Sequence, residues 1–171
     1  MRIIAGRWRG RRIVAPAGRQ VRPTGDRVRE AWMSILQHRL SDARVLDLFA
    51  GSGALGLEAL SRGAAHADFV ESSADSLRTL RANIETLGAR EQATVHRADA
   101  MRFVASLDED ACDIAFADPP YRLGLARALA ERWLEQPFAT VLGIEHEVRL
   151  AMPEGGDSRT YGDTMITFYR A

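Results

Sequence analysis

The sequence of 171 residues contains no lysine, a single cysteine and no long apolar run. A membrane-spanning helix needs about 20 consecutive apolar residues, and nothing here resembles a secretion signal, so we expect a soluble cytoplasmic protein without a membrane partner. Cys112 lies in the apolar stretch CDIAFAD and is expected to be a buried strand residue. No metal site is expected, because the four histidines are scattered along the chain and none stands at a metal-ligand spacing from this cysteine. They are His38, His66, His96 and His146.

Charge is divided unevenly along the chain, although the net charge is zero. All 23 basic residues are arginine, and nine of them fall within residues 1–29, which contain one acidic residue, Asp26. The remaining residues carry 14 arginines and 22 acidic residues. A basic segment on an acidic body favours a polyanionic partner, although a solvated basic face is the alternative. The candidate contacts with that partner are Arg7, Arg9, Arg11 and Arg12.

The N-terminal part predicts an arm followed by a helix. Residues 2–15 have the pattern of a β-hairpin with a turn near Gly10, which would divide the arginines between two strands. Apolar residues then recur at helical spacing up to residue 40, with Asp26 placed as the N-cap. We therefore expect a basic hairpin arm and loop over residues 1–23. The main domain should cover residues 24–171 and begin with a leading helix at 24–40.

The rest of the chain alternates between strand and helix patterns. Gly88 is expected to end one of the helices. Apolar strands in such an alternation are typical of a parallel sheet with helices on both faces, which is an α/β, Rossmann-like fold. Strands are predicted near residues 44–49, 67–71, 93–97, 112–117 and 139–145, and helices near 54–62, 73–87, 100–107 and 123–135.

The C-terminal segment breaks this alternation. Residues 159–161 and 163–169 predict a β-hairpin around Gly162-Asp163, with no helix between its strands. Such a hairpin adds an antiparallel strand to a seven-stranded, mostly parallel sheet. Dinucleotide-binding domains of the doubly wound type do not end in this way, whereas class I methyltransferases that use S-adenosylmethionine (AdoMet) do.

A glycine-rich loop follows the first strand of the main domain. The stretch LDLFAGSGALG places Gly51, Gly53 and Gly56 in the spacing that binds either a dinucleotide or AdoMet. Asp47 favours AdoMet, because a carboxylate attracts the α-ammonium of this cofactor and repels a pyrophosphate. We expect Glu71 to accept the ribose hydroxyls and Asp99 to accept the adenine amine, although Asp99 is also placed as an N-cap. Candidate contacts on the same loops are Phe49, Ala50, Ser52, Ser72 and Ala100.

The motif Asp118-Pro119-Pro120-Tyr121 follows the predicted strand at 112–117. The two prolines remove two backbone donors, so that carbonyl oxygens and the Asp118 carboxylate remain as acceptors. A conjugated exocyclic amine is a poor nucleophile, and hydrogen bonds to Asp118 and the Pro119 carbonyl would free its lone pair. Tyr121 would stack on the base that carries the amine. The motif alone does not distinguish adenine N6, cytosine N4 and guanine N2.

The chain resembles the RsmD family, bacterial methyltransferases that modify guanine N2 in 16S ribosomal RNA. The resemblance lies in MRIIAGRWRGRRI, RPTGDRVREAW, LDLFAGSGALGLEALSRGA, DPPY and YGDT, of which RPTGDRVREAW at 22–32 is the most specific. It implies AdoMet as cofactor, S-adenosylhomocysteine as product, and a monomer acting on 16S ribosomal RNA in a small subunit or assembly intermediate. It also implies that Arg22, Thr24 and the helix from Asp26 help to close the pocket.

Four other functions remain open from the residues. An adenine-N6 DNA methyltransferase is the main alternative, because the DPPY motif can hold either amine. A glutamine-side-chain methyltransferase would have little use for the arginine arm. An NAD-binding oxidoreductase conflicts with Asp47 and the terminal hairpin, and a catalytically silent RNA-binding module conflicts with the intact DPPY motif.

Overall fold

The computed structural model describes residues 1–17, 23–121 and 123–171, without the side chains of residues 23 and 24. None of the helices in these ranges is long and apolar enough to span a membrane. The strands are β1 (Arg44–Leu48), β2 (His66–Glu71), β3 (Ala93–Arg97), β4 (Cys112–Ala117), β5 (Ala139–Glu147), β6 (Asp157–Tyr161) and β7 (Thr164–Arg170). The helices are α1 (Pro23–Leu40), α2 (Ala54–Ser61), α3 (Ala74–Leu87), α4 (Ala100–Ala105) and α5 (Leu125–Glu135), with a 3-10 turn at Arg90–Gln92.

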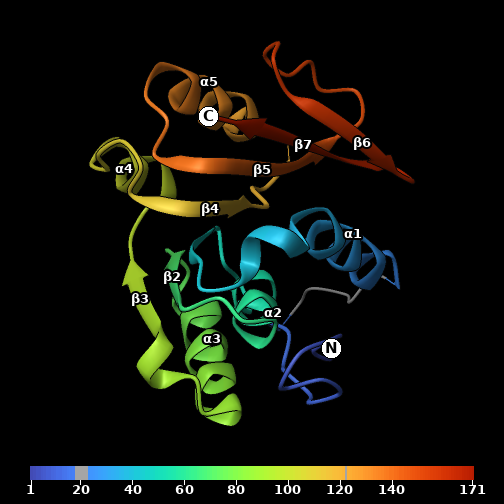
Figure 1. The fold of residues 1–171 in the computed structure, drawn as a ribbon, viewed down its shortest axis with the longest axis vertical. Helices are drawn as coiled ribbons and strands as arrows, with labels where there is room; N and C mark the ends of the chain where they lie inside the picture. The colour runs from blue at the N-terminus through green and yellow to red at the C-terminus, as the bar shows by residue number, and fades with distance from the viewer. Residues whose placement is uncertain (18–22, 122) are drawn as a thin grey trace.

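The strands form one sheet in the order β3-β2-β1-β4-β5-β7-β6 (Figure 1). The first five strands are parallel, and β7 runs antiparallel between β5 and β6. This confirms the predicted mostly parallel α/β sheet and its terminal hairpin, whose two-residue turn has Gly162 at φ +62°. The order reverses between β1 and β4, and ligands of open parallel sheets bind at the carboxyl ends of the strands at such a point.

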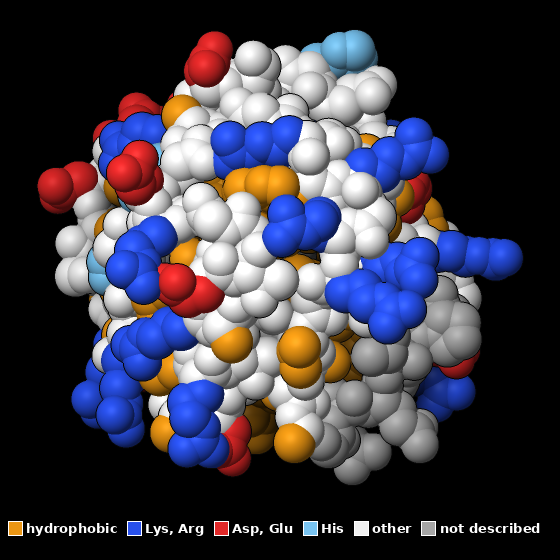
Figure 2. All heavy atoms as spheres, turned by 90° about the horizontal axis from the view of Figure 1, so that it is seen from below, with side chains coloured by type: hydrophobic (Ala, Val, Ile, Leu, Met, Phe, Trp, Pro, Cys, Tyr) orange, Lys and Arg blue, Asp and Glu red, His pale blue; other side chains and the backbone are white. Residues whose placement is uncertain are grey.

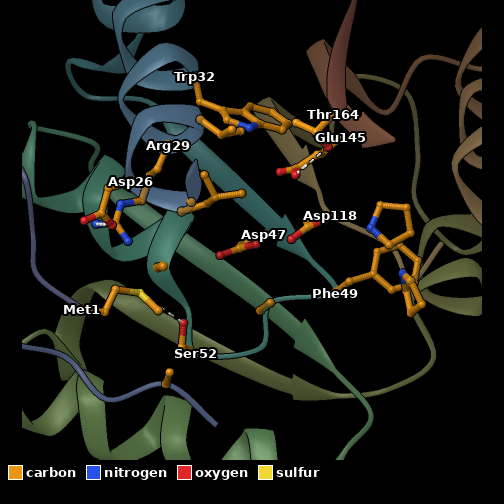
Figure 3. Close-up of a pocket in the computed structure, with 18 of the residues that line it drawn as sticks. Met1, Asp26, Arg29, Trp32, Asp47, Phe49, Ser52, Asp118, Glu145 and Thr164 are labelled. Carbon is orange, nitrogen blue, oxygen red and sulfur yellow. Dashed lines mark hydrogen bonds and ion pairs between the residues drawn. The ribbon is translucent and has the colours of Figure 1, made fainter. Parts of the chain in front are cut away.

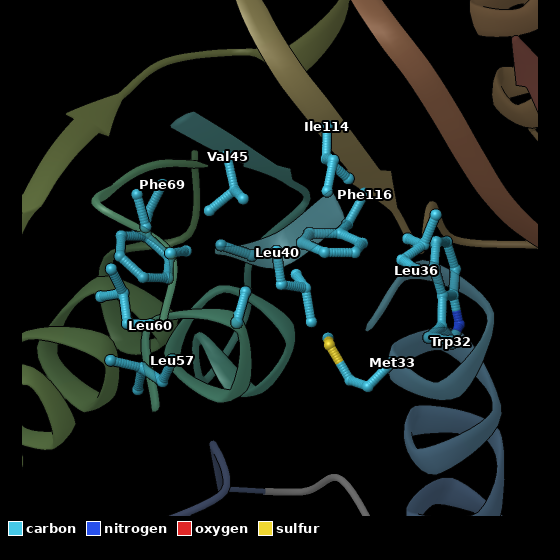
Figure 4. Packing of buried hydrophobic residues seen from close by; sticks show 14 of the residues in the cluster. Trp32, Met33, Leu36, Leu40, Val45, Leu57, Leu60, Phe69, Ile114 and Phe116 are labelled. Carbon is cyan, nitrogen blue, oxygen red and sulfur yellow. The ribbon is translucent and has the colours of Figure 1, made fainter. Parts of the chain in front are cut away.

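Two hydrophobic clusters lie on opposite faces of the sheet because side chains alternate along each strand. Val45 faces α1, α2 and α3, whereas Leu46 faces α4 and α5. Figure 4 shows the first cluster, in which Trp32 and Met33 from α1 pack beside Phe116 of β4. Trp32 makes edge-to-face contacts with Phe116 at 5.5 Å and with Phe168 at 5.6 Å between ring centroids. These two contacts attach α1 to strands β4 and β7.

Two local predictions were wrong at the N-terminal side. Helix α1 begins at Pro23, so Asp26 lies in the first turn and is not the N-cap. Proline suits the first helical position because its missing N–H would have no intrahelical acceptor there. Within residues 1–17 the arm also has no regular strands, although its two ends pair in the antiparallel sense of the expected hairpin: the Ile3 N–H donates to the Arg11 carbonyl at 2.9 Å and the Ile13 N–H to the Met1 carbonyl at 3.0 Å. A single antiparallel bridge joins Arg2 and Arg12, and residues 7–10 form turns.

Other signals in the sequence act as predicted. Gly88 caps the end of α3 in the left-handed conformation, at φ +67°. Asp99 caps α4, and its Oδ1 accepts the N–H of Arg102 at 2.9 Å. The proposed second role of Asp99, in binding adenine, stays a prediction.

Candidate active site

A cleft of about 1040 Å3 opens at the carboxyl ends of the central strands (Figure 3). It lies at the point where the strand order reverses, and α1 and the start of β7 form further parts of its wall. The structure brings together eight predicted site residues in its lining: Asp47, Phe49, Ala50, Ser52, Asp118, Pro119, Pro120 and Tyr121. Two predicted residues cannot be placed, because Arg22 lies outside the described residues and the side chain of Thr24 is not described.

Three carboxylates line the cleft from adjacent strands. Asp47 is paired with Phe116 in the β1–β4 register, and Asp118 stands two residues further along the same side of β4. Glu145 of β5 directly follows Ile144, the partner of Ala117, and therefore comes level with Asp118. All three side chains thus belong to the sheet face that α1 covers. Figure 3 shows Asp47 and Asp118 close together in the middle of the cleft.

Asp47 is almost fully buried, with 2% of its surface exposed. The pKa of its carboxyl group is raised to about 8, mainly by burial. The hydrogen bond from the Gly56 N–H opposes this rise, and the nearby Asp118 and Glu71 carboxylates contribute to it. A cation beside these acids would relieve the unfavourable desolvation and repulsion. The cleft therefore suits a positively charged ligand better than a pyrophosphate.

The glycine-rich loop owes its shape to close contacts and to left-handed backbone positions. Phe49 has φ +57°, and Gly53, which precedes α2, has φ +81°. A Cβ atom on Gly56 would lie 2.4 Å from the Phe69 ring and 3.2 Å from Asp47 Oδ2. A side chain at position 56 would therefore push α2 away from β2 and disturb the hydrogen bond that Asp47 accepts.

Glu71 holds the end of β2 to the glycine-rich loop. Its Oε2 accepts the Gly51 N–H at 2.8 Å, and its Oε1 accepts the N–H groups of Ser72 and Ser73 at 2.8 and 2.9 Å. Oε1 already accepts two bonds, but Oε2 accepts one and keeps a second lone pair, so the carboxylate retains acceptor capacity for a ribose hydroxyl. The predicted cofactor contacts outside the lining of the cleft are Gly51, Gly53, Glu71, Ser72, Asp99 and Ala100. Their contacts with a cofactor stay predictions.

The Asp118 motif is connected to β7. The Asp118 and Tyr121 side chains are exposed, whereas Pro119 between them is buried. The Tyr121 hydroxyl forms a short hydrogen bond with Thr164 Oγ1, and the same hydroxyl of Thr164 donates to Glu145 Oε1 at 3.1 Å. The motif is therefore joined to the third carboxylate of the cleft.

The N-terminal arm is fixed to the body by residues that the sequence did not single out. Glu58 of α2, with no exposed surface, accepts the N–H groups of Ile4 and Ala5 at 2.9 and 3.0 Å. It also forms ion pairs with Arg62 at 3.0 Å and with Arg29 at 3.7 Å. Further along the arm, Asn83 of α3 binds both backbone groups of Val14 at 2.8 Å.

The four arginines predicted to contact a polyanion, Arg7, Arg9, Arg11 and Arg12, are exposed. The Arg7 guanidinium lies 4.0 Å above the Trp8 ring and forms a hydrogen bond with Gln92, and Arg11 donates to the Thr86 carbonyl. Figure 2 shows the face seen from below in Figure 1, where arginine side chains are spread among a few acidic ones. Binding of a polyanion by these arginines stays a prediction.

Sequence reasoning missed several residues of the cleft. It assigned Trp32 to the core spacing of α1 and did not consider Arg29 or Glu145, all of which line the cleft. Arg29 is 5% exposed and pairs with Asp26 at 3.2 Å. Arg29 and Trp32 lie in the RPTGDRVREAW motif, so the resemblance gave a signal for their helix but not for the individual side chains. No motif marks Glu145, and its one signal was an acidic residue at the carboxyl end of a parallel strand.

The sheet order, the loop after β1 and the acidic motif after β4 define the class I methyltransferase fold. Over residues 1–170 the chain matches the family described as Conserved hypothetical protein 95. It is also 47% identical to ribosomal RNA small subunit methyltransferase D of Escherichia coli strain K12, over 90% of this chain and 78% of that protein. The chain belongs to this family, which confirms the resemblance to RsmD.

Two solved structures show the same fold. YhhF of Escherichia coli has a TM-score of 0.86 at 37% identity, and the match covers 99% of this chain and 97% of that chain. The 16S rRNA N2 methyltransferase RsmC of Thermus thermophilus, in complex with AdoMet and guanosine, has a TM-score of 0.68 at 20% identity. That match covers 90% of this chain and 44% of RsmC. At this identity the likeness to RsmC shows the fold alone.

Proposed function

We propose that the protein transfers a methyl group from AdoMet to the exocyclic N2 amine of a guanine in 16S ribosomal RNA. The observation that carries the proposal is the position of buried Asp47 beside the Asp118 motif in one cleft, at the reversal point of a methyltransferase sheet. Membership of the family supports methylation of small-subunit ribosomal RNA. The choice of guanine N2 is the finer part of the proposal.

The acidic cleft fits the charges of AdoMet. An ammonium at about 4 Å from the Asp47 carboxylate gains on the order of 4 kcal/mol at an effective dielectric near 20, before desolvation. Glu71 would accept the ribose hydroxyls, and Asp99 would accept the adenine amine. The cofactor supplies an electrophilic methyl group on its sulfonium, and all other roles fall to residues of this chain.

Asp118 and the Pro119 carbonyl would accept the two hydrogens of the guanine N2 amine. These bonds direct the amine lone pair out of conjugation and toward the methyl group, so that catalysis is largely positioning. After the transfer the amine carries an extra proton, which the exposed Asp118 carboxylate can pass to solvent. Tyr121 would stack on the base, which must be unpaired to enter the cleft.

We propose that residues 1–23 form the RNA-binding arm of a monomer, with Arg7, Arg9, Arg11 and Arg12 near phosphates. The substrate would be a small subunit or an assembly intermediate. Exposure of the four arginines and the excess of positive charge in residues 1–29 support this assignment.

Nucleoside mass spectrometry tests the product. Ribosomal RNA from a deletion strain should lack one N2-methylguanosine and keep its N6-methyladenosine, and the purified protein should restore the missing methyl group. Loss of N6-methyladenosine instead would reject guanine and leave the methyltransferase mechanism standing. Incorporation of labelled methyl groups into DNA but not RNA would reject the RNA substrate.

A further inference from the structure

We infer that Glu145 selects guanine by accepting the N1–H of the target base beside the reacting amine. The inference rests on the proposed function, because it assumes that Asp118 binds the N2 amine. It adds a specificity-determining residue that no motif in the sequence marks.

The register of the sheet places Glu145 next to Asp118. Ile144 of β5 pairs with Ala117 of β4, and each acidic residue is the next along its strand. Neighbouring strands are about 4.8 Å apart, so two carboxylate side chains on the same face can converge on donors at one edge of a single base. Two acceptors on one sheet face can therefore read adjacent positions of a single base.

Thr164 holds the Glu145 carboxylate in place. Its hydroxyl donates to Glu145 Oε1 at 3.1 Å and also bonds to the hydroxyl of Tyr121, the residue proposed to stack on the base. The aromatic platform and the carboxylate are thus joined through one side chain. In Figure 3 Glu145 and Thr164 lie together above Asp118, on the side of the cleft where Trp32 lies.

The Trp32 ring forms the wall of the cleft on the side of Glu145 and Thr164. Gly143 precedes Glu145 by two residues on the same face, and a Cβ atom there would lie 2.3 Å from Trp32 Cζ3. The absence of a side chain at Gly143 lets the indole pack against β5. Glu145 is consequently the first side chain of β5 on this face that can reach the cleft, and it is partly exposed there.

The chemistry of the two purines makes this position decisive. Guanine presents N1–H and its N2 amine side by side, and both are donors, whereas adenine N1 is an acceptor. An ionised carboxylate is an acceptor only, so it can bind guanine N1–H and repels the lone pair of adenine N1. Acceptors for the amine alone do not separate the purines, and a site built to hydrogen-bond one group rejects a substrate that lacks it.

The base 2,6-diaminopurine separates this role from amine binding, because it keeps the N2 amine and lacks N1–H. Small subunits are reconstituted with ligated 16S ribosomal RNA that carries guanine or diaminopurine at the position identified by mass spectrometry. We expect wild-type kcat/KM to be at least about 100-fold higher for guanine. Glu145→Gln, whose amide can donate to N1 of diaminopurine, should lower this ratio to about tenfold or less without changing AdoMet affinity.

Glu147→Gln is the matched control, because Glu147 lies on the same strand outside the lining of the cleft, and its ratio should equal that of the wild type. If Glu145→Gln does not fold, Thr164→Val tests the same point and should lower the ratio several-fold. A wild-type ratio in the folded variant overturns the inference while guanine methylation stands. A wild-type protein that does not methylate guanine N2 at all overturns the proposed function.

Discussion

The backbone N–H of Gly56 donates a hydrogen bond of 2.9 Å to Asp47 Oδ2 and so joins the third glycine of the loop to the buried acid of the cleft. This one bond is a small compensation for burying a carboxylate whose pKa is raised from 3.8 to about 8. This unfavourable burial of a carboxylate lies at the place where a cationic cofactor is proposed to bind. Functional sites commonly keep such locally unfavourable groups at a cost in stability.

Asp47→Asn should stabilise the ligand-free protein and weaken AdoMet binding. Because the folded pKa lies above the unfolded value, the contribution of Asp47 is most favourable below pH 4 and is lost as the pH rises to about 8. The amide cannot ionise, so the variant should gain Tm over the wild type at pH 8 and little at pH 4. Thermal unfolding at both pH values measures this, with the exposed Asp108→Asn as control. Equal Tm differences at the two pH values would contradict the prediction.

Asp118→Ala should lower turnover by about 100-fold or more and change AdoMet affinity only a few-fold. The reason is that the amine contact matters mainly in the transition state, whereas Asp47 and the loop bind the cofactor. Single-turnover rates and calorimetric titration of S-adenosylhomocysteine separate the two effects. Near-normal turnover would show that Asp118 is not the acceptor of the amine.

Replacing Arg7, Arg9 and Arg11 with glutamine should weaken RNA binding and its dependence on salt. Each lost phosphate contact should reduce the slope of log K against log salt by roughly 0.7–0.9. Binding of 16S ribosomal RNA is measured over a range of salt concentrations. The control replaces three exposed arginines elsewhere, Arg78, Arg127 and Arg159, with glutamine. The two triple variants then have the same net charge. Identical slopes for the two triple variants would rule out a specific role of the arm.

Glu58→Gln should destabilise the protein by about 3–5 kcal/mol, because it removes the charge that partners the mostly buried Arg62 and leaves the buried Arg29 with only the exposed Asp26. Urea unfolding measures the loss in the free energy of unfolding. Glu85→Gln removes an exposed ion pair with Arg90 and should cost less than about 1 kcal/mol. A similar small loss for Glu58→Gln would mean that the arm is held mainly by its apolar side chains.

The parts of the fold that could be predicted have a regular local pattern. The parallel strands, the helices between them and the Gly162 turn were visible from apolar runs and turn residues. The arm was misjudged, because its shape depends on Glu58 and Asn83, which are more than 50 residues away along the chain. The start of α1 was missed because Pro23 occupies the first helical position and Asp26 resembles a cap.

The site was predictable where a motif follows a strand and unpredictable where tertiary packing supplies the residue. Asp47 lies near the end of one recognisable strand and Asp118 directly follows another, and the structure places both in the cleft. Glu145 and Trp32 reach it through strand register and through the space left by Gly143. Neither property is encoded in the spacing of nearby residues.

The anchoring of the arm has a consequence for synthesis of the chain. Ile3, Trp8 and Ile13 are buried in the finished protein. The groups that bind the backbone of the arm belong to Glu58, Ser61 and Asn83, which are translated much later. At 5–20 residues per second, the arm waits on the order of several seconds before it can dock. During this interval its apolar side chains are exposed to the crowded cell, and the arginines between them act as gatekeepers that oppose aggregation. The same charges that are proposed to bind RNA therefore protect the nascent chain first.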